Sequence, residues 1–138
     1  MKFLVHSENK GGKRVRNALA FAEQYSKLLK IQDFEHTCTI IVRDNFKNAG
    51  QLFYEGDHSF LVLKADQVSV MMQTLAHEMV HLKQFVTGEL GHTKGGNLKW
   101  KGKVYTEKKM PNWVNRPWEI EAMQKEVILH YYAQIVLA

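Results

Sequence analysis

Residues 66–88, DQVSVMMQTLAHEMVHLKQFVTG, carry the most regular apolar pattern in the 138-residue chain. Apolar residues recur there at intervals of four and three, which places them on one face of an α-helix. These positions are Val68, Met72, Leu75, Met79, Leu82 and Val86. Asp66 is the expected N-cap, and Gly88 marks the expected end. The pattern predicts an amphipathic helix between Asp66 and Gly88.

The centre of this predicted helix holds the motif His77-Glu78-Met79-Val80-His81. Residues four apart lie one helical turn from each other, so His77 and His81 can present two imidazoles to one tetrahedral metal ion. Glu78 then projects beside the metal, within reach of a water molecule that it can deprotonate as a general base. The pattern therefore predicts metal-assisted hydrolysis. The structural alternative is a pair of histidines held by ordinary hydrogen bonds.

The part of the chain before this helix contains one more helical pattern and several extended segments. Apolar residues at helical spacing predict an N-terminal helix over residues 13–31, after the Gly11-Gly12 breaker. Residues 37–42 are β-branched and apolar, and two further extended runs follow at 51–54 and 59–63. Glu55-Gly56-Asp57 separates the last two. A small sheet that contains a hairpin is expected.

The part after the helix divides into a loop and a last helix. Residues 88–117 are rich in glycine and contain short aromatic segments, so they predict a long loop with one hairpin. Pro117 suits the first turn of a C-terminal helix, whose apolar positions continue nearly to the end of the chain. The expected fold is α+β, with an N-terminal helix, a small sheet, the motif-bearing helix, the loop and the C-terminal helix.

Composition and length predict one folded domain over residues 1–138. Hydrophobic residues make up 45% of the chain and charged residues 24%, as in an average globular protein. No apolar run reaches 18 residues, and the N-terminus turns polar after Val5, too soon for a signal peptide. Cys38, the single cysteine, has no intrachain partner and is expected to be a buried strand thiol and not a ligand. We therefore expect a cytoplasmic protein without a membrane segment.

The net charge of the chain is +5, from 19 basic and 14 acidic residues. Such an excess makes weak association with nucleic acid or acidic partners physically reasonable. The basic residues are spread along the sequence, and no nucleic-acid-binding motif accompanies them. Solvated surface is the simpler interpretation, with weak nucleic-acid association as the alternative.

A catalytic zinc site needs a third protein ligand besides His77 and His81. Metzincins place a histidine six residues after the second one, and here that position is Thr87. That class is therefore excluded. Three candidates remain: Glu119 and Glu121 near the start of the last helix, and His92 in the glycine-rich loop.

The segments LAHEMVHLKQ, GEL, WKGK and PWEIEA, between residues 75 and 126, resemble small phage-encoded metallopeptidases within the gluzincin-like zincins. The resemblance implies a minimal zincin-like domain, a Zn²⁺ cofactor and, for a phage-encoded protein, the host cytoplasm. It also implies a third ligand in an E-x-x-A pattern, which Glu119 to Ala122 match with Glu119 as the ligand. The acidic residue that often follows the alanine in this family is Met123 here.

A weaker similarity links the chain to SprT-like DNA-associated proteases, in which a third histidine follows the motif in a His-Gly context. His92-Thr93-Lys94-Gly95 matches this context loosely and makes His92 the rival ligand. The four-cysteine zinc ribbon that often accompanies those proteins is not present, since Cys38 is the single cysteine.

The expected activity is hydrolysis of peptide bonds in a peptide or protein substrate, with Glu78 as general base. The strand around residues 60–63 is the candidate edge for a bound peptide, and an ordinary core strand is the equally open alternative. The hydrogen-bond donor that would stabilise the oxyanion is left undecided among five residues: His92, Tyr105, Arg116, His130 and Tyr131. Two alternatives stay open as well: a zinc-stabilised binding module without turnover, and hydrolysis of an amide outside proteins, since the motif fixes the reaction better than the substrate.

Overall fold

The computed structural model describes residues 1–8 and 12–138. Its elements follow in this order: β1 (Lys2–Ser7), α1 (Gly12–Leu28), β2 (Thr37–Arg43), β3 (Gly50–Tyr54), β4 (His58–Lys64), α2 (Val68–Val86), β5 (Leu90–His92), β6 (Leu98–Trp100), β7 (Lys103–Tyr105), the 3-10 turns Glu107–Lys109 and Trp113–Asn115, and α3 (Pro117–Leu137). The fold is α+β, as the sequence predicted.

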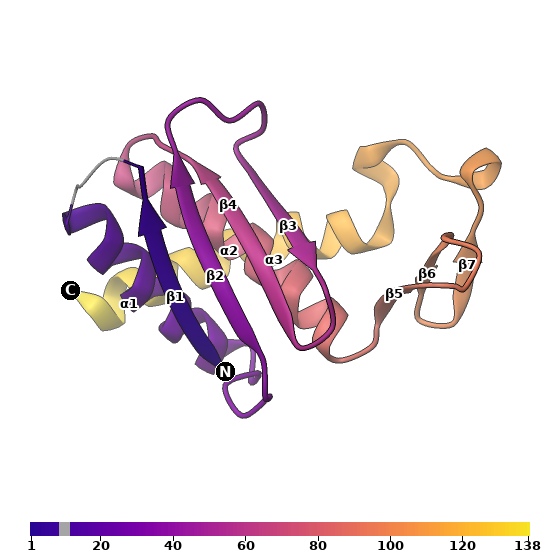
Figure 1. The fold of residues 1–138 in the computed structure, drawn as a ribbon, viewed down its shortest axis with the longest axis horizontal. Helices are drawn as coiled ribbons and strands as arrows, with labels where there is room; N and C mark the ends of the chain where they lie inside the picture. Colours follow the sequence, from indigo (N-terminus) through magenta and orange to yellow (C-terminus); the bar gives the residue numbers. More distant parts are fainter. Residues whose placement is uncertain (9–11) are drawn as a thin grey trace.

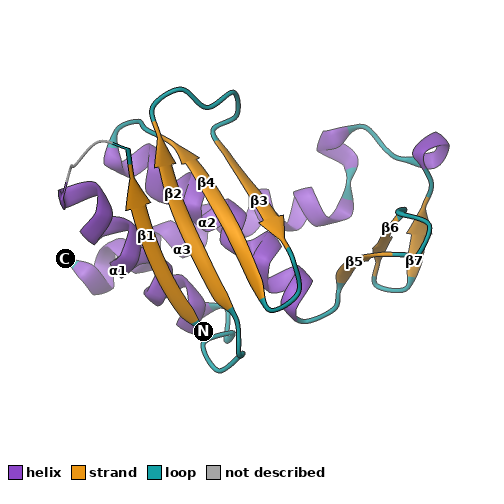
Figure 2. Ribbon diagram, viewed as in Figure 1, coloured by secondary structure: helices purple, strands orange, loops and turns teal. Residues whose placement is uncertain are grey.

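The larger sheet has four strands in the order β1-β2-β4-β3. β1, β2 and β4 run parallel, whereas β3 pairs antiparallel with β4 through the predicted hairpin. Gly56 in the hairpin turn has a φ of +78°, a conformation that glycine adopts without strain. All three helices lie on one face of this sheet (Figures 1 and 2). β3 is therefore one edge of the sheet, and β4 is an interior strand.

The structure adds one strand to the expected sheet and decides one open alternative. β1 was not predicted, and it adds a strand before the N-terminal helix by pairing with β2, about 35 residues later in the sequence. Its six residues, KFLVHS, give a weak local signal because they do not alternate between polar and apolar, and the non-local pairing decides the conformation. Residues 60–63 were left open between an edge strand and a core strand, and β4 is the core strand, because it lies between β2 and β3 with hydrogen-bonded neighbours on both sides.

The main core lies between the sheet and the helices. Cys38 and Ile40 of β2 and Leu61 of β4 are fully buried in this core, so the predicted burial of the thiol is confirmed. The predicted apolar face of α2 forms the other side of this core. The hydroxyl of Tyr25 in α1 donates to the backbone oxygen of Met72 at 2.8 Å, which satisfies a buried polar group between two helices.

The start of α2 differs from the sequence expectation. Asp66 is not the N-cap: α2 begins at Val68, Gln67 takes the cap position, and Asp66 Oδ1 accepts the N–H of Gln67 at 2.7 Å. The backbone N–H of Ala65 still donates to Arg43 at the end of β2, so the chain stays extended through that residue and the helix starts later. α1 likewise ends at Leu28, before the predicted limit of residue 31.

The predicted loop with one hairpin is instead a three-stranded antiparallel sheet, β5-β6-β7. We call residues 90–110 the arm, because they extend beyond the end of the four-stranded sheet (Figure 1). A second apolar cluster, Leu90, Trp100, Tyr105 and Trp118, attaches the arm to the start of α3. Two adjacent turns, near Gly96 and Gly102 with φ of +85° and +87°, allow the chain to reverse twice within a few residues.

No helix in the described ranges is both long enough and apolar enough to span a lipid bilayer.

Candidate metal centre

His77, His81 and Glu119 converge where α2 packs against the first turns of α3. His77 and His81 lie one turn apart on α2, and Glu119 is the third residue of α3. The Nε2 atoms of both histidines lie 3.0 Å from the same atom, Glu119 Oε1. The three side chains are mostly shielded from solvent. Of the described residues, these three form the one group of acidic, histidine or cysteine side chains spaced to hold a metal ion.

The other ring nitrogen of each histidine has its own acceptor. His77 Nδ1 lies 3.0 Å from Glu126 Oε1, and His81 Nδ1 lies 2.8 Å from Gln84 Oε1. A carboxylate or an amide oxygen can only accept, so each Nδ1 must carry the proton. A neutral imidazole then has its lone pair on Nε2, the atom that faces Glu119. Both rings are thus held in the tautomer that a metal ligand requires.

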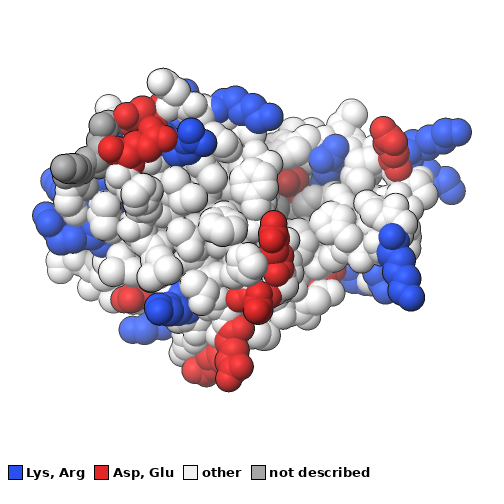
Figure 3. Space-filling model, viewed as in Figure 1, with Lys and Arg blue, Asp and Glu red and all other residues white. Residues whose placement is uncertain are grey.

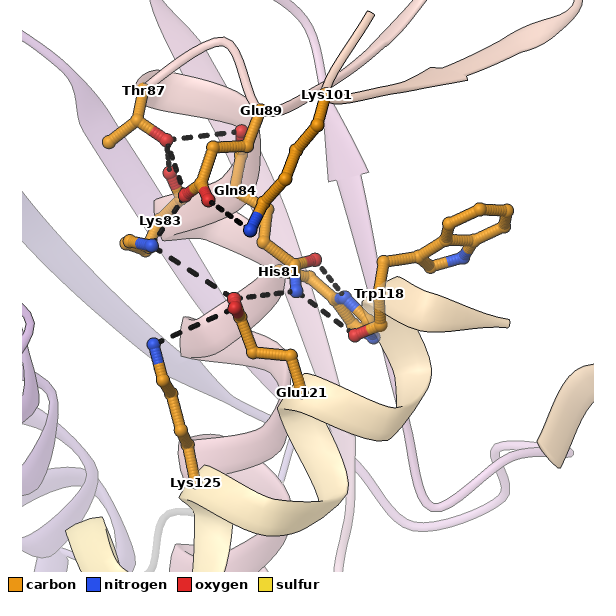
Figure 4. A network of polar contacts seen from close by, with 9 residues as sticks. All are labelled: His81, Lys83, Gln84, Thr87, Glu89, Lys101, Trp118, Glu121 and Lys125. Atoms are coloured by element: carbon orange, nitrogen blue, oxygen red, sulfur yellow. Dashed lines mark hydrogen bonds and ion pairs between the residues drawn. The ribbon is translucent and has the colours of Figure 1, made fainter. Parts of the chain in front are cut away.

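The orientation of Gln84 follows from its own neighbours (Figure 4). Its Nε2 donates to the backbone oxygen of Trp118 at 3.0 Å and to Glu121 Oε1 at 3.1 Å. Both partners are acceptors, so the amide oxygen of Gln84 is the atom that faces His81. Lys125, 3.8 Å from the Glu121 carboxylate, and Lys83, at 4.0 Å, balance the charge of Glu121. This network ties α2 to α3 behind the candidate ligands.

The donor set fits a zinc ion. Two imidazole nitrogens and one carboxylate oxygen are a common ligand set for catalytic zinc, and ligands about 2.0–2.2 Å from a tetrahedral ion lie roughly 3.3 Å apart. The two nitrogen–oxygen separations here are both 3.0 Å, and the three ligand atoms lie within 4.8 Å of one another. Small side-chain movements would accommodate the ion. The residues therefore fit a metal with three protein ligands.

The charges at the centre shift the pKa values of its residues in opposite directions. Burial alone would lower the pKa of His77, but hydrogen bonds to the Glu119 and Glu126 carboxylates raise it to about 9. Burial would raise the pKa of Glu119, but hydrogen bonds from His77 and His81 lower it to about 2. The pKa of His81 is also raised, because contact with Glu119 outweighs its burial. Without a metal, the centre is an ion pair of a protonated imidazole and a carboxylate.

Glu78 is buried beside this centre without a partner for one of its oxygens. Its Oε2 atom receives no hydrogen bond from any described residue, and 7% of the residue is exposed. Burial raises the pKa of its carboxyl. A buried carboxylate oxygen without a donor is costly, and Glu78 is one of the residues that line the cleft described below. Glu78 plays no part in the hydrogen bonds among the three candidate ligands.

The edge strand approaches Glu78 closely at Gly50. A Cβ atom at Gly50 would lie 2.7 Å from Thr74 Cγ2 and 3.2 Å from Glu78 Cγ. The first separation is below ordinary contact, so a larger side chain would push β3 away from α2. The absence of a side chain at position 50 therefore lets β3 border the centre directly.

The centre opens into a cleft of about 900 Å³. β3 forms one wall through Gly50, Gln51 and Leu52, and the arm forms another through Leu90, His92 and Leu98. Trp113, in the turn before α3, stacks on the ring of His77 with the ring centres 6.2 Å apart. The cleft is thus lined by polar and apolar residues in about equal number, and the candidate ligands are among the polar ones.

The structure separates the three candidates for the third ligand. Glu119 meets both histidines, as described above. Glu121 bonds Gln84 and the lysines on the other side of α3, so it acts on His81 through Gln84. His92 lies in the arm wall with its ring stacked on Phe85, outside the group that could hold the metal. The geometry favours Glu119.

Of the five expected oxyanion donors, only His92 lines the cleft. The other four lie elsewhere, in the arm, in the turn before α3, or on later turns of α3: Tyr105, Arg116, His130 and Tyr131. These four were open candidates for the oxyanion donor, and their positions away from the cleft do not favour them. His130 shares a helix face with Glu119, but three turns of helix carry it away to a contact with Phe21 of α1.

Sequence reasoning missed Glu126 and Gln84, which hold the two rings. Both follow helical spacing: Glu126 is seven residues after Glu119, and Gln84 is three residues after His81. The expected carboxylate was at position 123, where the chain has Met123. Glu126 lies one turn further and reaches His77 from there. A search for polar residues three, four or seven positions from each ligand would have found both.

Comparisons with known proteins give no assignment. No protein-family model matches the chain, and no curated protein or solved structure matches it significantly, so the chain is not assigned to a family.

Proposed function

We propose that the protein is a zinc-dependent hydrolase that cleaves peptide bonds, with His77, His81 and Glu119 as metal ligands and Glu78 as general base. One observation carries the proposal: three metal-ligand atoms converge next to a buried carboxylate that has an unpartnered oxygen. The four side chains face one cleft. An arrangement that only joined helices would have no need for an unpartnered acid at this place.

The ligand count supports a catalytic site over a structural one. Structural zinc sites have four protein ligands, usually including cysteine, whereas catalytic sites have three and leave one position for water or substrate. The candidate group among the described residues has three members, and Cys38 is buried in β2 away from it. The position of the group at the cleft leaves the remaining side accessible.

Glu78 is proposed to move the proton. A zinc ion held by His77, His81 and Glu119 would supply a Lewis acid, which would polarise the scissile carbonyl and lower the pKa of a water molecule toward about 7. Glu78 accepts the proton of the attacking water and donates it to the leaving amine.

β3 supports a peptide as the substrate. In the described part of the chain β3 pairs only with β4, so its outer edge is free, and Gly50, Gln51 and Leu52 border the cleft. An extended peptide can add to such an edge through main-chain hydrogen bonds. This edge replaces the interior strand around residues 60–63 as the proposed binding element. His92, on the opposite wall, is the proposed donor to the oxyanion.

The Glu78→Gln variant tests the proposal, with Glu23→Gln on the exposed side of α1 as the matched control. We expect about one zinc per chain in all three proteins, and cleavage of a diverse peptide library by wild type and control, detected by mass spectrometry. Glu78→Gln should lower the rate by about 10²-fold or more without loss of zinc or folding.

Two outcomes would count against the proposal. If wild-type protein purified in the presence of zinc contained none, the proposed metal site would be refuted. Zinc binding with no cleavage of any peptide, and equal stability of wild type and Glu78→Gln, would instead support the zinc-stabilised binding module.

A further inference from the structure

The net charge of the protein is concentrated in the arm. Residues 90–110 contain six lysines and one acidic residue, Glu107, which gives +5. The rest of the chain has thirteen basic and thirteen acidic residues and is neutral overall. Figure 3 shows basic side chains at the end of the molecule where Figure 1 places the arm. The excess charge noted in the sequence is therefore a local feature of one surface.

The arm lysines are available to a partner. All six are exposed: Lys94, Lys99, Lys101, Lys103, Lys108 and Lys109. Lys101 lies 3.7 Å from Glu89, and the other five form no ion pair with a described residue. Lys101 and Lys103 each cover an aromatic ring, of Trp100 and Tyr105 respectively. At least four lysines thus present charge without a neutralising neighbour.

These lysines face away from the cleft. Leu90, His92 and Leu98 are the arm residues that line it, and none of the six lysines does. A peptide bound in the cleft would therefore meet the apolar and imidazole side of the arm. The charge is placed to attract a polyanion to the outside of the arm, beside the candidate metal centre.

The composition of the outer surface favours a phosphate backbone over an acidic protein. Protein interfaces need exposed aromatic or large apolar anchors, whereas Trp100 and Tyr105 are buried against Trp118 and Val104 is the one large apolar side chain that the arm exposes. Between the lysines the arm has glycine, threonine and asparagine, whose small polar groups suit contacts to phosphate oxygens: Thr93, Gly95, Gly96, Asn97, Gly102 and Thr106.

We propose that the arm binds the phosphodiester backbone of duplex nucleic acid without sequence preference. The basic residues are all lysines, which act as point charges, and the arm has no arginine for bidentate recognition of guanine. Single-strand binding proteins stack bases on exposed aromatic rings, and the tryptophan and tyrosine of the arm are buried. Binding does not depend on the metal or on hydrolysis.

The test compares two variants of equal net charge. The arm variant combines Lys94→Gln, Lys99→Gln, Lys108→Gln and Lys109→Gln. The control variant removes four charges from α1, at the other end of the molecule in Figure 1, through Lys13→Gln, Arg14→Gln, Arg16→Gln and Lys27→Gln. Fluorescence anisotropy measures binding to labelled DNA duplexes of about 20 base pairs and two unrelated sequences, with a chelator present, from about 50 to 200 mM salt.

We expect micromolar binding at the lowest salt, equal for both sequences, and a steep decrease in affinity with salt that reflects about four to six phosphate contacts. The arm variant should bind the duplex at least tenfold more weakly than wild type, and its slope of log affinity against log salt concentration should be smaller by about three to four. The affinity of the control variant should stay within about threefold of that of wild type.

Three results would overturn the proposal. They are no duplex binding by wild type at the lowest salt, equal losses in the two variants, and tighter binding of polyglutamate than of duplex, which would identify an acidic protein as the partner. Unchanged circular dichroism spectra show that both variants fold. The chelator keeps this result independent of the proposed hydrolase, whose failure would leave duplex binding unchanged.

Discussion

Removal of the Glu126 carboxylate should weaken zinc binding although Glu126 does not contact the metal position. Glu126 Oε1 accepts from His77 Nδ1 at 3.0 Å, and its other oxygen accepts from Gln73 Nε2 at 3.0 Å. Glu126→Gln keeps one acceptor for His77 and loses the charge, while Glu126→Ala removes the acceptor as well. The two variants therefore separate the effect of the charge from that of the hydrogen bond.

The expected size follows from the environment of His77. Its side chain is 14% exposed, so solvent replaces the lost acceptor poorly. A hydrogen bond to a charged group contributes about 1 kcal/mol more than a neutral one, and loss of such a supporting group costs about 10- to 100-fold in metal affinity. We expect a loss of about tenfold for Glu126→Gln and about 100-fold for Glu126→Ala.

Competition with a chromophoric zinc chelator at constant pH measures these affinities, with circular dichroism as the check on folding. Glu23→Gln on α1 is the control and should bind as wild type does. An alanine variant within threefold of wild type would refute the idea that Glu126 holds His77. Equal losses in the two Glu126 variants would show that the charge, and not the position of the acceptor, is what His77 requires.

Three further predictions concern the surroundings of the centre. Gly50→Ala should lower the free energy of unfolding in urea by about 1–3 kcal/mol, because the new Cβ would lie 2.7 Å from Thr74 Cγ2. Adding Thr74→Ser to the same chain removes this methyl group and should recover part of the lost stability. Zinc binding near pH 7.5 should release about one proton, because His77 has a pKa of about 9 without metal. The zinc affinity should therefore rise as the pH approaches this pKa. Calorimetry in buffers of different ionisation enthalpy measures the number of protons released. His92→Ala should lower kcat by about 10²-fold with zinc content unchanged, as measured by elemental analysis and peptide cleavage.

Each of these has a contradicting result. Full stability of Gly50→Ala would mean that β3 is not pressed against α2. No proton release would mean that His77 is neutral before zinc binds. Loss of zinc from the His92 variant would make His92 a ligand, and an unchanged rate would remove it from the mechanism.

The sequence by itself determined the elements whose signal is local. α2 and its two histidines follow from a spacing of four residues, because helical geometry alone brings such residues onto one face. The β3–β4 hairpin follows from Glu55-Gly56-Asp57, since a short turn fixes the pairing of its two neighbours. The burial of Cys38 follows from the apolar run around it.

The tertiary structure decided what depends on distant partners. β1 forms by parallel pairing with a segment about 35 residues away. The sequence of its six residues is too weakly patterned to predict this pairing. Strand order made β3 the edge and β4 an interior strand, and order within a sheet is a property of the whole fold. Glu119 and Glu121 lie two positions apart and point to different sides of α3. Only the packing of α3 on α2 turns Glu119 toward the histidines, because a helix presents whichever face its neighbours bury.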